Sequence, residues 1–561
     1  MDDSPSSPAA RRRKRFWRRR VVLVTVTIVV AILALFVDET TALHLRAGPL
    51  EGDARVYSRI ADNVIDHGVF SAEEQPDRDQ QFPPTIIRLP GYPIFLAAIY
   101  YVAGNDNYSA AQAVQGALHF GSAILAALLA FSWAGGKRRR RRTAAFFAFV
   151  LAAFCPFTVN YSAALLTEVL TIFLLMAMML FATYAIKTDR LSRSLLWWAL
   201  SGLVAGFAVE VRPDAGLFAL GLGLAVVIAS MARHGFRYGM LHALARGSVY
   251  SVAFALVLIP WTVRNERVFG QFQPLSPQHA EAPGEFVPLG YFAWLRTWVD
   301  DPRYVSPMLW DLEIHRIDTA KIPARAYTND REQAEIATLF DQYNNSDPDH
   351  PLNPKPDANA SDNDNDDNSD DSADTNSDES DQGSADDDPD QADDELDLHL
   401  SPESDAAFAD IARRRIADHP INYYLELPAI RSTKMWFDAH ADFYPFAGSL
   451  FPLMDLDTET YQHLWLPLFF GIVCLYTLLA ICGIILMLIR RQPSALIWVV
   501  MALLVSLPRI VFFGTLENPE PRYLIELFFI AAILGAIALS RVSLRSARGQ
   551  HAIVLDYARG R

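Results

Sequence analysis

Long runs of apolar residues dominate the pattern of hydrophobic and polar positions along this chain. Ten of these runs are long enough to cross the hydrocarbon layer of a bilayer as helices. They occupy residues 21–37, 111–135, 143–160, 163–186, 195–211, 214–232, 247–263, 463–489, 494–513 and 522–540. The pattern predicts an all-α polytopic membrane protein with about ten transmembrane helices.

Basic residues predict how these spans are oriented. Counting alternate loops from a cytoplasmic N-terminal tail, residues 1–20, places the other basic clusters on the same side as that arginine-rich tail. These clusters are 137–142, 187–193, 233–246, 490–491 and the C-terminal tail 541–561. Because basic loops stay in the cytoplasm, we expect a bacterial inner-membrane protein with both termini inside. A cleaved signal peptide is the alternative for residues 21–37, and the length of that run disfavours it.

Two large segments then lie outside. The first, residues 38–110, contains an amphipathic helix from about residue 51 to a Gly68 cap and an interfacial apolar stretch, 91–102, that is too short to span. The second, residues 264–462, is expected to be a mainly helical periplasmic domain. It separates an N-terminal membrane module, 21–263, from a C-terminal module, 463–540. Its interior, 345–397, is mostly Asp, Asn, Ser and Gly, which predicts disorder.

Charge and short motifs limit the cofactors. The net charge is −15, and residues 347–397 hold 21 Asp or Glu and one Lys. We interpret this segment as a solvated tether, and calcium binding is the alternative, although the spacing matches no EF-hand loop. The cytoplasmic loops are short and contain no GxGxxG or GKS/GKT stretch. We therefore expect no nucleotide cofactor, whereas a divalent cation stays open.

Candidate chemistry gathers at the outer ends of the spans. Asp53 starts the amphipathic helix and is either a catalytic carboxylate or a helix N-cap. Glu168 lies about one turn into an apolar run, where a carboxylate is costly and usually faces a cavity or a partner. Guanidiniums at headgroup depth can bind a lipid-borne phosphate, or they can simply anchor the spans. A carboxylate that faces them can deprotonate an attacking hydroxyl.

The predicted site residues are the following: Asp53 as the catalytic group; Arg88, Arg212, Arg264, Arg509 and Arg522 as ligands of the donor phosphate; and Tyr57, Glu168, Asn265 and Tyr523 as further candidates. No metal ligands are assigned.

The same residues carry a family resemblance. In order along the chain, the motifs are Gly52-Asp53…Tyr57…Gly68-Val-Phe70, Arg88-x-Pro-Gly-Tyr-Pro, Leu-Leu-Thr-Glu168, Arg212-Pro, Pro-Trp-Thr-Val-Arg264-Asn265 and Arg522-Tyr523. The set resembles the bacterial GT-C glycosyltransferases. More narrowly, it is similar to glycosyltransferase family 39 and its relatives, which include dolichyl-phosphate-mannose protein mannosyltransferases and lipid A aminoarabinose transferases. The resemblance covers roughly residues 20–270 and 460–540.

The resemblance implies a GT-C-like fold, a polyprenyl-phosphate-linked sugar donor, inverting transfer of the hexosyltransferase type, and Asp53 as the base. Many relatives carry a second acidic residue directly after that aspartate, where this chain has Ala54, and the difference disfavours a metal ion at this position. The acceptor stays open between an envelope lipid, a glycan and a protein.

Three other functions are compatible with parts of the pattern. A secondary transporter would need ionisable residues near the bilayer midplane and internal repeats, and neither is evident. An O-antigen polymerase or ligase also uses outer arginines, but the early Asp53 helix argues against it. A non-catalytic scaffold that displays the acidic segment would depend on residues 345–397, whereas an enzyme would keep its activity without them.

Overall fold

A computed structural model describes residues 25–41 and 50–541, with gaps at 27, 38–39, 77–80, 280, 348–396, 445, 447, 449, 451–459 and 490–492. The prediction of disorder for residues 345–397 therefore falls almost entirely outside the described residues. The chain forms two compact units. The first contains residues up to Val287, Pro428–Thr515 and the chain from Pro519, and the second contains Pro288–Leu427 with Leu516–Asn518.

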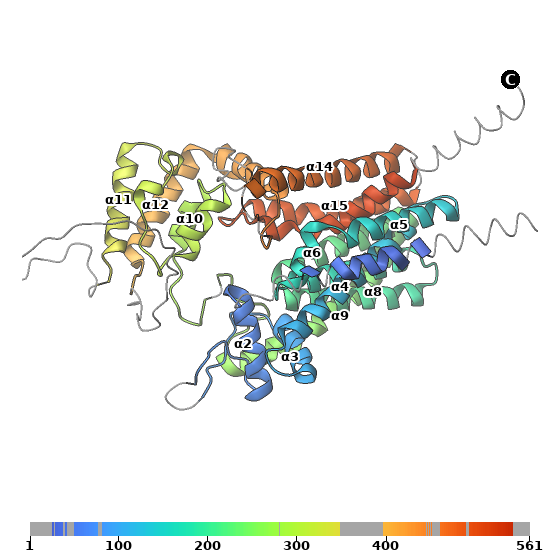
Figure 1. Cartoon of the computed structure of the whole chain (residues 1–561), viewed down its shortest axis with the longest axis horizontal. Coiled ribbons are helices and arrows are strands. Elements are labelled where there is room, and N and C mark those ends of the chain that lie inside the picture. Colours follow the sequence, from blue (N-terminus) through green and yellow to red (C-terminus); the bar gives the residue numbers. More distant parts are fainter. Residues whose placement is uncertain are drawn as a thin grey trace, which may run out of the picture. The chain divides into compact units, whose positions relative to one another are not determined.

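The first unit is a bundle of long apolar helices (Figure 1). Its main helices are α4 (Tyr108–Trp133), α5 (Arg138–Ala153), α6 (Pro156–Ala163), α7 (Glu168–Lys187), α8 (Leu191–Val211), α9 (Gly216–Phe269), α14 (Thr460–Ile489) and α15 (Pro493–Gly514). Shorter apolar helices span Ile28–Val37 and Leu527–Arg541. Six helices among the described residues are long and apolar enough to cross a membrane, or up to seven if α5 and α6 form one bent span. The all-α polytopic fold is confirmed, and the count of ten spans stays a prediction.

Glycines allow these helices to approach closely. A Cβ atom at Gly221 would lie 2.2 Å from the carbonyl oxygen of Leu504, and one at Gly483 would lie 2.1 Å from that of Leu534. Both distances are far below van der Waals contact. Small residues at such positions let helix backbones pack against each other, which is how helices associate in a bilayer that offers no hydrophobic driving force.

The α9 helix is a hairpin and not a single rod. At 1.5 Å per residue its 54 residues would far exceed the thickness of a bilayer. Gly235 has φ +72° and ψ 178° and breaks the helix. The two arms then pack against each other, because the Tyr250 hydroxyl donates to the Ala219 carbonyl at 2.9 Å. The arms correspond to the predicted spans 214–232 and 247–263.

The chain between α5 and α7 differs from its prediction. The helices α5 and α6 meet at a bend of 52°, and residues 164–167 are not helical. Asn160, the last residue of the predicted span 143–160, therefore lies in α6, near the end of the bent pair. Glu168 is the first residue of α7, so the helix begins later than the predicted span 163–186, although Glu168 does lie about one turn into the apolar run. The apolar letters Ala164-Leu165-Leu166 contain no turn residue that could reveal the break.

Two shorter helices precede the bundle in the chain and pack on each other. Helix α2 spans Gly52–Asp66 and α3 spans Gly91–Ala103, which confirms both predicted elements. Gly68 has φ +68° directly after the α2 cap, as a C-terminal glycine should. A Cβ atom at Gly91 would lie 2.6 Å from the backbone carbonyl of Glu210. The start of α3 is therefore seated directly against the end of α8.

The second unit is a small helical domain with an aromatic core. Its main helices are α10 (Leu289–Arg296), α11 (Asp330–Asn344) and α12 (Pro402–Asp418), seen together in Figure 1. The rings of Tyr291, Trp294, Phe340 and Phe408 pack against one another with centroids 5.1–6.2 Å apart. The backbone N–H of Asp397 donates to the Asp347 carboxylate at 3.1 Å. The acidic segment thus leaves and re-enters this domain at one place.

Candidate active site

Asp53 is the centre of a half-buried cluster of charges in the first unit. Its carboxylate accepts a hydrogen bond from the Arg88 guanidinium at 2.8 Å, and its other oxygen lies 3.7 Å from Arg522. Arg522 also pairs with Glu520. The side chains of Asp53, Arg88 and Arg522 are 32%, 25% and 28% exposed. A ligand could therefore reach these side chains, and their ion pairs hold them in place.

Local structure explains why these groups meet. Asp53 stands in the first turn of α2, whereas the N-cap is Glu51, so the alternative that Asp53 is the cap is wrong. Arg88 lies two residues before Pro90, the N-cap of α3. Arg522 lies in the 3-10 helix η8, Pro521–Leu524. Because α2 and α3 pack together, the α2 carboxylate and the guanidinium that precedes α3 lie at the same end of this helix pair.

A second, buried network of charges lies in the same unit. Arg212 donates to Glu168 at 2.8 Å and to Asp214 at 3.2 Å. Arg509 lies 2.7 Å from Asp214 and donates to both Glu526 oxygens at 3.1 and 3.2 Å. Arg212 also approaches Glu526 to 3.5 Å. The side chains of Arg509 and Glu526 are fully buried. The network therefore joins α7, α8, α15 and the segment that follows η8 inside the fold.

This network has more carboxylates than guanidiniums. Three acidic groups share two arginines, and the second carboxylate oxygen of Glu168 is buried without a hydrogen-bond partner among the described residues. Buried charges of this kind are costly unless each is paired. Arg212 and Arg509 are therefore buried and already paired with protein carboxylates, whereas Arg88 and Arg522 are paired but partly exposed.

Tyr57 is a half-buried tyrosine of α2 on which both charge clusters act. It follows Asp53 by one turn of α2, and its ring meets that of Tyr92 edge-on at 5.0 Å. Burial raises the pKa of Tyr57 to about 12; Asp53 and Glu168 raise it too, while Arg88 and Arg212 lower it. The charges of both clusters therefore act on this hydroxyl. The phenol stays protonated at neutral pH and can donate a hydrogen bond.

The remaining predicted residues have mainly structural contacts. The Arg264 guanidinium donates to the Thr85 carbonyl at 2.8 Å and lies over the Trp261 ring at 4.8 Å. Asn265 donates to the Gln273 carbonyl at 2.7 Å and holds the chain that leaves α9. Tyr523 presents its carbonyl to Arg509 at 2.7 Å.

Sequence reasoning missed several charged partners. Asp214, Glu520 and Glu526 were not among the predicted site residues, although each pairs with a predicted arginine. Asp442 follows α13 (Leu427–Trp436) and accepts a hydrogen bond from Tyr161 of α6 at 2.6 Å. An ion pair between residues distant in sequence leaves no local pattern. The sequence did offer one local signal for these acids. Asp214 follows the predicted Arg212 by two positions, and Glu526 follows the predicted Arg522 by four.

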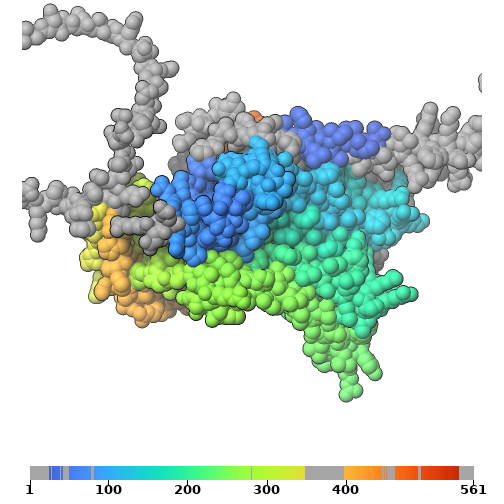
Figure 2. All heavy atoms as spheres, turned by 90° about the horizontal axis from the view of Figure 1, so that it is seen from below, coloured from blue at the N-terminus to red at the C-terminus, as the bar shows by residue number. Residues whose placement is uncertain are grey.

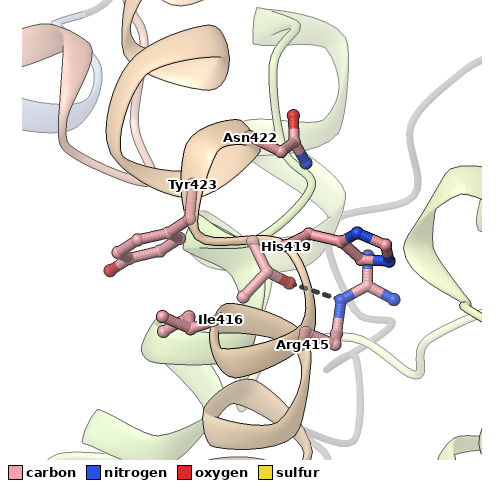
Figure 3. A pocket seen from close by; sticks show the side chains of 6 residues that line it. Arg415, Ile416, His419, Asn422 and Tyr423 are labelled. Atoms are coloured by element: carbon pink, nitrogen blue, oxygen red, sulfur yellow. Dashed lines mark hydrogen bonds between the residues drawn. The ribbon is translucent and has the colours of Figure 1, made fainter.

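The second unit has a small pocket that carries no comparable chemistry. It is lined by Thr297, Arg415, Ile416, His419, Asn422 and Tyr423 (Figure 3). Arg415 donates to the Thr297 hydroxyl at 2.9 Å and to Glu332 at 2.6 Å. Its guanidinium is used to join α12 to neighbouring segments. Across the described part of the chain, no group of three or more His, Cys, Asp or Glu is arranged to hold a metal ion.

Part of the sequence matches a known protein family. Residues 66–276 match the model of the dolichyl-phosphate-mannose-protein mannosyltransferase family. The match spans less than half of the chain, and it confirms the resemblance inferred from the motifs. It supports a multi-pass membrane glycosyltransferase of the GT-C type. Arg88, Glu168, Arg212 and Arg264 lie within the matched residues. No curated protein matches the chain.

Two solved structures are similar to this chain. One is ArnT from Cupriavidus metallidurans in the apo state, with 15% identity and a TM-score of 0.33, covering 93% of this chain and 78% of that one. The other is ArnT from the same organism bound to undecaprenyl phosphate, with 13% identity and a TM-score of 0.33, covering 92% and 78%.

Proposed function

We propose that this protein is an inner-membrane glycosyltransferase that moves a sugar from a polyprenyl-phosphate carrier to an acceptor on the extracytoplasmic side. The observation that carries this proposal is the partly exposed cluster of Asp53, Arg88 and Arg522. A carboxylate between two guanidiniums provides both functions that such a transfer needs, a proton acceptor and a binding site for the leaving phosphate. The family match over residues 66–276 supports the same reaction class.

Arg88 and Arg522 are the groups best suited to the donor phosphate. Both guanidiniums are partly exposed and converge on one carboxylate. A phosphate that reaches them would compete with Asp53 for their N–H groups, because planar guanidiniums bind phosphate oxygens in pairs. Donor binding would then loosen the hold of both arginines on Asp53. The carboxylate would be freed for proton transfer only when the donor is in place.

The reaction would then proceed as a single displacement. The acceptor hydroxyl oxygen attacks the anomeric carbon, its proton passes to Asp53, and the bond from that carbon to the phosphate oxygen breaks. The leaving polyprenyl phosphate keeps the electron pair, and Arg88 and Arg522 neutralise its charge. Attack from the face opposite the phosphate inverts the anomeric centre.

The buried network is assigned a different role from the one its sequence suggested. Arg212 and Arg509 are held by Glu168, Asp214 and Glu526, and we assign them to positioning α7, α8 and α15 around the site. Arg264 lies against Thr85, three residues before Arg88, and supports that loop. The second oxygen of Glu168 is buried and has no partner among the described residues, so we assign Glu168 to holding Arg212.

A deletion strain provides the test. Profiling of lipid-linked sugars and envelope glycans should show a donor that accumulates and a product that disappears, with both changes reversed by the wild-type gene. Genes that encode Asp53→Asn, Arg88→Gln or Arg522→Gln should fail to restore the product. Arg55→Gln is the matched control, because Arg55 lies on α2 and pairs with exposed Glu74. Full complementation by Asp53→Asn would contradict the proposal.

A further inference from the structure

Among the described residues, one end of the membrane bundle is rich in positive charge. The described segments 134–143, 187–193 and 233–246, with Arg541, contain thirteen Lys or Arg and one Asp. Contacts place these segments together: Lys187 donates to the Ser132 carbonyl, and Arg233 donates to the Ile186 carbonyl at 2.6 Å. In Figure 2 the cyan to green segments around residues 140, 190 and 235 gather at one end of the visible face.

Few carboxylates balance this charge. The only acid in these segments, Asp189, pairs with Arg233. The side chains of Lys137, Arg138, Arg139 and Arg142 are exposed and make no ion pair with any described residue. Arg190, Arg193 and Arg237 are exposed as well. We name these seven residues the basic end.

The position of these cations within helices makes them costly. Arg138–Arg142 form the first turn of α5, and Arg193 lies in the first turn of α8. A helix N-terminus carries partial positive charge and favours acids, so cations there are destabilising, as are like charges four residues apart. Arg141 fixes the start of α5 against the end of α4, because its Nε donates to the Phe131 carbonyl at 2.9 Å. The exposed guanidiniums are therefore held near one another, where an anion would relieve the repulsion.

Exposed aromatic and aliphatic residues lie next to cations of the basic end. Phe236 and Tyr238 flank Arg237 at the tip of the α9 hairpin and are 70% and 72% exposed. Leu241 and Leu244 follow them and are also exposed. Aromatic and aliphatic side chains beside arginines are typical of the bilayer interface, where rings sit at headgroup level. A soluble polyanion would leave these apolar side chains in water, whereas a lipid would cover them.

We propose that the basic end binds the headgroups of anionic phospholipids, with the cluster Lys137, Arg138, Arg139 and Arg142 at its centre. The phosphates of the lipid lie against the guanidiniums and the α5 N-terminus, and the acyl chains cover the neighbouring apolar side chains. This site lies at the opposite end of α8 from Arg212, and it does not depend on the proposed reaction.

The test uses the purified full-length chain in nanodiscs of phosphatidylcholine, with or without phosphatidylglycerol. For the wild type, phosphatidylglycerol should raise the apparent melting temperature and be enriched among the lipids that co-purify. The triple variant Arg138→Gln, Arg139→Gln, Arg142→Gln should lose both effects, with a drop in enrichment of roughly fivefold for each charge removed. The matched control Arg331→Gln, Arg413→Gln, Arg414→Gln removes three exposed charges from the second unit and should keep both effects.

Three results would overturn the proposal. One is an unchanged phosphatidylglycerol effect in the α5 variant, and another is the same loss in the control. The third is an equal temperature shift with inorganic phosphate in detergent, which would assign the site to a free anion. If the triple Gln variant does not insert into nanodiscs, the phosphatidylglycerol effect on the wild type is measured at increasing salt concentration instead. The lipid effect should weaken as salt rises, and an effect that salt leaves unchanged would exclude headgroup binding.

Discussion

Arg509 offers the sharpest test of the buried network. Replacing it with Met removes the guanidinium that lies 2.7 Å from Asp214 and 3.1 Å from Glu526. Breaking a buried ion pair typically costs about 3–5 kcal/mol. Arg212 still reaches Asp214 at 3.2 Å and Glu526 at 3.5 Å, so we expect the lower value, about 3 kcal/mol.

This loss should appear as a fall in apparent melting temperature. A long chain loses about 2 °C per kcal/mol, so the expected fall is roughly 6 °C. Because membrane proteins often unfold irreversibly, the scans must be made at one fixed heating rate. The exposed Arg413, also replaced by Met, is the control and should shift the temperature little.

A double variant separates the ion-pair explanation from simple loss of packing. Adding Glu526→Met to Arg509→Met removes the carboxylate that the first change leaves unpaired. The double variant should therefore be more stable than Arg509→Met alone, since apolar replacement of a whole buried pair is often neutral. A double variant that is less stable than either single variant, or an Arg509→Met protein as stable as the wild type, would refute this reasoning.

Three further predictions concern the backbone and pH. Gly91→Ala should lower transfer about 100-fold with a folded protein, because its Cβ would meet the Glu210 backbone at 2.6 Å and displace Arg88; activity and melting temperature are measured together. Gly235→Ala should cost about 1–2 kcal/mol, from its φ of +72° alone, in a melting scan. The pKa of Asp62 is raised from 3.8 to about 7 by burial and by Asp106. The unfolded chain releases this proton first, so stability should fall as pH rises from about 4 to about 7, and Asp62→Asn should flatten that decline.

The sequence allowed a good prediction of elements whose ends carry local signals. Helices α2 and α3 were expected at nearly their observed bounds, because Gly68 and the Pro90-Gly91 pair mark where chain segments end and begin. The break before Glu168 has no such marker, since residues 164–167 are as apolar as a helix interior. Apolar composition reports burial in lipid, and it cannot tell a continuous helix from two helices with a short break.

The candidate site was predicted in part. Asp53 and Arg88 were expected to share one outer surface, and the structure brings them to 2.8 Å. The acidic partners of Arg509 were not expected, because Asp214 and Glu526 come from segments that only the fold brings next to it. The number of arginines on one side of a membrane overestimates the positive charge that a ligand can meet, because protein carboxylates neutralise part of it.

The central claim is that Asp53 takes the proton in a transfer from polyprenyl phosphate. The most direct measurement follows release of free polyprenyl phosphate from a polyprenyl-phosphate-linked hexose when an envelope extract supplies the acceptor hydroxyl. It compares purified wild type, Asp53→Asn and the control Asp66→Asn. Asp66 lies at the far end of α2 and accepts a hydrogen bond from Asn105 at 2.8 Å. Wild type and Asp66→Asn should release the carrier at similar rates, and Asp53→Asn should lose release by at least about 100-fold. Release by Asp53→Asn at the wild-type rate would contradict the assignment.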